Sequence, residues 1–101
     1  MTEPLVFRTA DGAVTLTASA LNGVAARAAE SVEGVRLRRP RRAVEVGHGD
    51  GRASVSLELG ARHGVPLPAL ARSVQERVAE AVAAVTGLEV ERVDVEIAEV
   101  S

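Results

Sequence analysis

Between residues 70 and 85, apolar residues recur at intervals of three or four, and this stripe constrains the fold more than any other feature. It consists of Leu70, Val74, Val78, Val82 and Val85. That spacing is the period of an α-helix with one buried side. Pro66 and Pro68 flank its start, where a missing N–H costs little, and Thr86-Gly87 ends it. We therefore predict an amphipathic helix that packs one side on a second structural layer.

Alternation of apolar and polar residues predicts that this second layer is a β-sheet, because a strand with one buried face has a period of two. The clearest alternation buries Val55, Leu57 and Leu59 on one side. The last one, over residues 93–97, is apolar on one side and acidic on the other. Shorter alternations predict a strand at residues 13–16 and another that starts at Val35, is interrupted at Arg39-Pro40 and resumes at Val44 and Val46.

Another helix is predicted between residues 17 and 32. Thr17 or Ser19 can cap its start, and Gly34 is well placed to follow its end. Its apolar positions, again at spacings of three and four, are Leu21, Val24, Ala25, Ala28 and Val32. Because most of them are small, this helix can lie close to a sheet.

Glycine dominates the segment Gly47–Gly51, which joins two predicted strands. The glycines supply positive φ angles and Asp50-Gly51 is a strong turn dipeptide, so the segment predicts a hairpin loop. Glycine-rich loops also bind phosphate, but those loops lead into a helix and usually carry a lysine. This loop does neither and contains an acid, so we favour the hairpin.

The predicted order is β-α-β-β-α-β in one domain over residues 1–101, with a flexible N-terminus over residues 1–11. Both helices are amphipathic on one side only. We therefore predict an α+β protein of two layers, with two helices on one face of a mostly antiparallel sheet and a ferredoxin-like topology. Its core must consist of valine, leucine and alanine, because the chain has one phenylalanine and no tyrosine or tryptophan.

Composition also limits the cellular setting. There is no cysteine, which excludes disulfides and thiolate metal sites. No apolar run approaches the roughly 20 residues that a membrane span needs. The segment Met1–Phe7 carries an acid where a signal peptide has basic residues. We therefore expect a cytoplasmic protein that reaches a membrane only through a partner.

A metal site is not expected, because His48, His63 and Asp50 are too few ligands for one. Catalysis is not expected either. The candidate carboxylates all fall on predicted solvent faces, where they lack the burial that tunes a general acid. These carboxylates are Glu58, Glu76, Glu80, Asp94 and Glu96. The serines, Ser54, Ser56 and Ser73, have no predictable histidine and aspartate partners. We therefore expect no catalytic residue, no cofactor and no enzymatic activity.

Arginines gather in residues 36–42, with five in seven positions. Alone, the cluster is typical of a protein that binds nucleic-acid phosphates. No aromatic residue lies within the cluster to stack on bases, and without these five charges the net charge of −2 becomes −7. The alternative is that Arg36 and Arg38 pair with acidic residues across the sheet, or that the cluster and Pro40 protect a sheet edge.

Taken together, these motifs make the chain resemble the alkaline-shock and general-stress family of envelope stress response proteins. The resemblance runs over residues 12–100 and is most specific from Val74-Gln75 to Val95. It includes the segment Val65-Pro66-x-Pro68 before the helix and Thr86-Gly87-Leu88 after it. The resemblance implies a small cytoplasmic protein without catalytic motifs, found in Gram-positive bacteria and gathered at the membrane by a separate membrane-anchored partner.

We therefore predict a non-enzymatic adaptor or scaffold of the envelope stress response. The alternative is a small nucleic-acid-binding module that uses Arg36–Arg42. The exposed last strand has no proline and could pair with a partner or a second copy, which makes a homo-oligomer possible. The residues predicted to bind a partner are Arg36, Arg38, Arg39, Arg41, Arg42, Glu58, Asp94 and Glu96.

Overall fold

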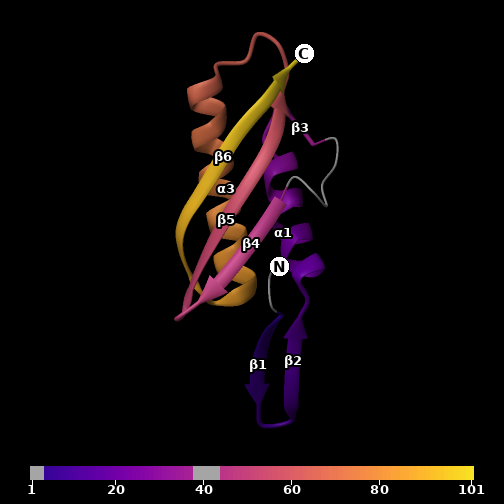
Figure 1. Cartoon of the computed structure of the whole chain (residues 1–101), viewed down its shortest axis with the longest axis vertical. Coiled ribbons are helices and arrows are strands. Elements are labelled where there is room, and N and C mark those ends of the chain that lie inside the picture. The colour runs from indigo at the N-terminus through magenta and orange to yellow at the C-terminus, as the bar shows by residue number, and fades with distance from the viewer. Residues whose placement is uncertain (1–3, 38–43) are drawn as a thin grey trace.

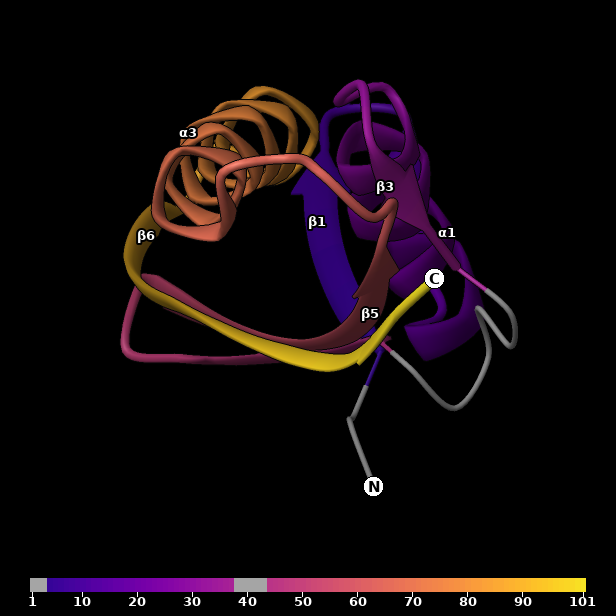
Figure 2. The same cartoon turned by 90° about the horizontal axis from the view of Figure 1, so that it is seen from above.

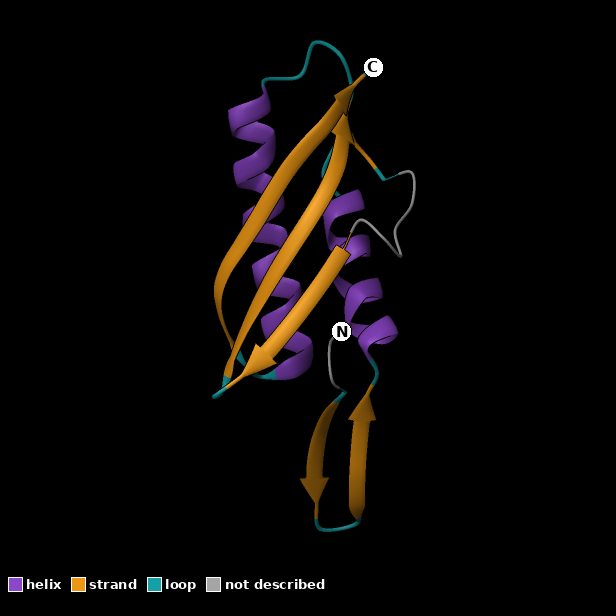
Figure 3. Ribbon diagram, in the orientation of Figure 1, coloured by secondary structure: helices purple, strands orange, loops and turns teal. Residues whose placement is uncertain are grey.

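The computed structural model describes residues 4–37 and 44–101. Within these ranges the chain forms six strands and two helices (Figure 1), namely β1 (Leu5–Thr9), β2 (Gly12–Leu16), α1 (Ala18–Glu30), β3 (Val35–Arg36), β4 (Val44–Gly49), β5 (Arg52–Ala61), α3 (Leu67–Thr86) and β6 (Glu89–Val100). The protein is therefore α+β, as predicted (Figure 3). The predicted order of elements is wrong, because two strands precede α1 and three lie between the helices.

The main sheet is built around β5. Both β3 and β4 pair with it antiparallel, whereas β6 pairs with it parallel over nearly its whole length. Strand β6 occupies one edge of β5. The other edge is shared by β3 and β4, which pair with opposite ends of β5. The connection from β5 to β6 runs through α3, and a crossover of this kind joins parallel strands. The ferredoxin-like topology is not confirmed, because no strand separates β5 from β6.

The strand expected to separate them forms a hairpin with β1 instead. The two strands pair antiparallel from Leu5–Leu16 to Thr9–Gly12 and project beyond the end of the main sheet (Figure 1). Residues 1–11 were expected to be flexible, and the structure places Leu5–Thr9 of that segment in β1. The mobility of this segment stays a prediction.

Both helices lie on the same face of the main sheet, so the predicted two-layer arrangement is confirmed (Figure 2). The core forms between these layers from valine, leucine and alanine. Helix α3 contributes Leu70, Val74, Val78 and Val82, each at most 4% exposed. Val85 is 46% exposed, and Thr86 is buried in its place. The prediction for Val85 is wrong because the stripe continues at an interval of four to Thr86, whose hydroxyl donates to the carbonyl of Val82 at 2.7 Å.

Local signals in the sequence position these elements as expected. Thr17 caps α1, since its hydroxyl oxygen accepts a hydrogen bond from the Ala20 N–H at 3.1 Å. The β4–β5 connection is a two-residue hairpin turn in which Asp50 and Gly51 have φ angles of 53° and 73°. Positive φ at both central residues defines a turn that matches the twist of the flanking strands. The hairpin prediction for this loop is confirmed.

Candidate functional site

Among residues 4–37 and 44–101, nothing forms a second layer on the face of the main sheet that points away from the helices (Figure 2). We call this face the outer face. Its polar side chains are Arg36 on β3, Glu45 on β4, Ser54, Ser56 and Glu58 on β5, and Arg92, Asp94 and Glu96 on β6. All are exposed except Ser54, which is half-buried. The outer face is therefore a polar surface formed by four strands, of which β6 is far from the other three in the sequence.

Three of the predicted partner-binding residues, Glu58, Asp94 and Glu96, meet on this surface. Glu58 lies directly opposite Glu96, and Asp94 lies opposite Ser56 on the same pair of strands. Neighbouring like charges on adjacent strands are destabilising. Within the described residues neither Glu58 nor Glu96 has an ion-pair partner. Over the residues that the structure describes, this end of the outer face therefore holds two neighbouring carboxylates without an ion-pair partner.

Of the five arginines in the cluster at residues 36–42, Arg36 lies within the described residues. Arg36 is exposed at the end of the sheet, opposite Gly60. Of the acidic residues considered as partners for Arg36 across the sheet, Asp94 lies beside Ser56 and pairs with Arg92 at 2.8 Å. The other predicted residues, Arg38, Arg39, Arg41 and Arg42, lie outside the described residues.

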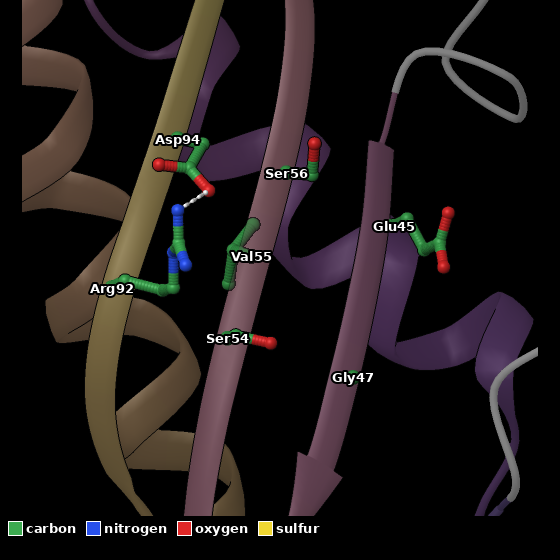
Figure 4. A pocket seen from close by; sticks show the side chains of 7 residues that line it. All are labelled: Glu45, Gly47, Ser54, Val55, Ser56, Arg92 and Asp94. Atoms are coloured by element: carbon green, nitrogen blue, oxygen red, sulfur yellow. Dashed lines mark ion pairs between the residues drawn. The ribbon is translucent and has the colours of Figure 1, made fainter.

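A shallow hollow of about 300 Å³ lies at the centre of the outer face (Figure 4). It is lined by Glu45, Gly47, Ser54, Val55, Ser56, Arg92 and Asp94. The absence of a side chain at Gly47 opens it, since a Cβ there would lie 3.4 Å from the Ser54 hydroxyl. Figure 4 shows the Arg92 guanidinium directed at Asp94, while Glu45 points away from the hollow.

Arg92 is the functional candidate that sequence reasoning missed. Its hydrogen bond to Asp94 raises the pKa of Arg92 above its ordinary value. Both side chains are largely exposed, so the pair contributes little to stability. The alternation predicts a last strand from Val93, whereas β6 begins at Glu89. The period of two, extended backwards from Asp94 and Glu96, would have placed Arg92 on the same face.

The chemistry available on this surface is that of exposed charges and hydroxyls. The two histidines lie at opposite ends of β5 and cannot share a site: His48 pairs with Ala53, and His63 follows Ala61. Over residues 4–37 and 44–101, no three histidine or carboxylate side chains are grouped as a metal site requires. In the same part of the chain, neither helix has the length and apolar character to cross a membrane. The expectations of no enzymatic activity and no cofactor stay predictions.

A comparison with protein families places this surface in context. The model of the alkaline shock protein 23 family, described as having a cell envelope-related function, matches residues 36–101. Comparisons with curated proteins and with solved structures returned no match. The resemblance seen in the sequence begins earlier, at residue 12. The matched part begins at Arg36 of β3 and contains β4, β5, α3 and β6, which together hold the whole outer face.

Proposed function

Because the chain belongs to the alkaline shock protein 23 family, which has a cell envelope-related function, we propose that it is a non-enzymatic adaptor or scaffold of the envelope stress response. In this proposal a membrane-anchored protein partner recruits it to the cytoplasmic face of the membrane. The chain itself supplies a binding surface and no chemistry.

The observation that supports this function is the uncovered outer face. It is polar and exposed, and at its acidic end Glu58 and Glu96 have no ion-pair partner within the described residues. A surface of exposed charges on a rigid sheet suits recognition by a second protein, because complementary charges set specificity and orientation. The family match includes every strand of this surface, with β3 entering at Arg36.

Fractionation of the native host, expressing a tagged copy, tests the proposal. We expect recovery with the membranes that survives nuclease and is lost in a high-salt wash, followed by crosslinking to one membrane-anchored protein. Nuclease-sensitive sedimentation with nucleoid or ribosomes would refute the adaptor function and favour nucleic-acid binding by Arg36–Arg42.

A matched pair of double variants tests the outer face itself. Glu58→Arg with Glu96→Arg reverses the two acidic residues of the outer face. Glu76→Arg with Glu80→Arg makes the same charge change on the exposed side of α3. We expect the first double variant to lose membrane recovery and the second to keep it. Equal behaviour of the two would show that the outer face does not carry the binding.

A further inference from the structure

Strand β6 forms one edge of the main sheet. It has 12 residues, more than any other strand in the described chain, and it pairs with β5 only (Figure 1). Two register shifts interrupt the β5–β6 pairing and leave a regular stretch between them, from Arg92 to Ile97. Six residues of regular strand are enough for an extended peptide to pair with.

The backbone groups of this stretch alternate between the two edges of β6. The carbonyl of Val93 accepts a hydrogen bond from the side-chain amide of Gln75 on α3 at 3.1 Å, so it points away from β5. By alternation, the N–H and carbonyl groups of Val95 and Ile97 point to the same outer edge. Within residues 4–37 and 44–101, no backbone group bonds to them from that side.

An apolar strip beside this edge is incompletely covered. On β5, the helix-facing residues Val55, Leu57 and Leu59 are at most 3% exposed. Their neighbours on β6, Val95 and Ile97 among them, are only half-buried although they pack against the same core. They lack a neighbouring strand on the outer side. A strand added to β6 would cover this strip and satisfy the free backbone groups together.

The opposite edge of the sheet is protected. Strand β3 has two residues and β4 has six. The side chain of Asn22 on α1 accepts a hydrogen bond from the Val46 N–H at 3.1 Å, which occupies an outward backbone donor of β4. Short strands and covered donors are the usual ways in which proteins stop their edges from pairing. Along the longer β6, one such contact is seen, that of Gln75.

Charge indicates what would pair with β6. The strand carries five acidic residues and one basic residue, Arg92, which is already paired with Asp94. Across the β5–β6 pairing Glu96 lies opposite Glu58, and neither has an ion-pair partner within the described residues. A second copy of β6 would bring another acidic strand against this one, whereas a basic strand would supply the missing counter-charge. The edge therefore suits a different protein better than a second copy.

We propose that the outer edge of β6, between Arg92 and Ile97, binds an extended segment of the partner by strand addition, and that this segment alternates basic and apolar residues. The basic residues lie on the outer face beside Glu96, and the apolar residues cover the strip at Val95 and Ile97. This inference rests on the adaptor function proposed above and names the chemistry of its partner.

Backbone NMR of the purified full chain with a synthetic probe tests the inference. The probe is a capped hexapeptide of alternating lysine and valine, and its control alternates glutamate and valine. We expect the lysine peptide alone to slow hydrogen exchange of the Val95 and Ile97 amides by at least about tenfold. Slow exchange of these amides in a dimer formed without peptide would overturn the inference in favour of self-pairing.

Two methylated probes separate strand addition from charge attraction. One is N-methylated at every valine and the other at every lysine, so each loses the N–H donors of one peptide edge and keeps all its charges. Strand addition uses one edge of the peptide, so we expect one of the two to bind and the other not to bind. Equal binding of both would overturn the inference and leave only charge attraction.

A charge variant locates the site. Glu96→Lys should weaken binding of the lysine peptide by about threefold or more, whereas Glu76→Lys on α3, with the same charge change, should not. Equal weakening by both would mean that only net charge matters. Membrane recovery in the host without peptide binding would overturn strand addition alone, and peptide binding without membrane recovery would overturn the adaptor function alone.

Discussion

Two valines on α3, three residues apart, give a direct test of how this helix faces the sheet. Val82 is 1% exposed and Val85 is 46% exposed. Shortening a valine to alanine removes two methyl groups, worth about 1.6 kcal/mol of burial at a fully buried site, and the cavity that remains adds to this. Alanine favours a helix over valine by about 0.5 kcal/mol. We therefore expect Val82→Ala to lower the free energy of unfolding by about 2 kcal/mol.

The same change at Val85 is the control. About half of this side chain is already in water, so the lost burial is about 0.8 kcal/mol, and the helix preference of alanine offsets most of it. We expect a change smaller than about 0.5 kcal/mol. Urea unfolding, with a slope of about 1–3 kcal/mol per molar, should then show a midpoint lowered by about 1 M for Val82→Ala only. Equal losses in both variants would refute the orientation of α3 in which Val82 faces the sheet and Val85 faces solvent.

Other predictions test the strands, the first helix and the hairpin. Val95→Asp, which puts a charge beside the core, should lower the free energy of unfolding by about 2 kcal/mol or more, while Glu96→Lys on the outer face should cause no loss; thermal melts that fall equally would show that the parity of β6 is wrong. Thr17→Ala should cost about 1 kcal/mol in urea unfolding because the Ala20 N–H loses its cap, and Thr17→Ser should restore most of it. Gly51→Val should cost about 1–2 kcal/mol by the same measurement, because a φ of 73° strains any residue with a branched Cβ, and an unchanged midpoint would contradict the turn geometry.

The sequence predicts which side of each element is buried better than it predicts pairing. Val55, Leu57 and Leu59 are buried as their alternation indicates, and the caps and turns lie where their residues suggest. These features depend on neighbours within a few residues along the chain. Val85 and Thr86 differ from the prediction because hydrophobicity alone favours valine, although the helix period places the threonine inside and its hydroxyl finds partners there.

Pairing between strands depends on residues far apart, and here the prediction is wrong. Alternation looks the same in a parallel and an antiparallel strand, so the parallel pairing of β5 and β6 leaves no local signal. Asp11-Gly12 is a turn signal, but no strand is predicted for residues 5–9, which precede it and form β1. Once β1 pairs with β2, the latter is no longer available to separate β5 from β6, and the ferredoxin-like order is lost.

The candidate site follows from this same pairing. Alternation alone assigns Glu58, Asp94 and Glu96 to the exposed side of their strands, but only the register brings Glu58 and Glu96 together. Strand β6 is an edge of the sheet, as the sequence predicts, and it has an outward row of backbone groups and an acidic outer side. The uncovered face and the open edge therefore meet along β6. Both lie within the residues matched by the family, whereas the β1–β2 hairpin and α1 lie outside them, so we expect partner binding to depend on residues 36–101.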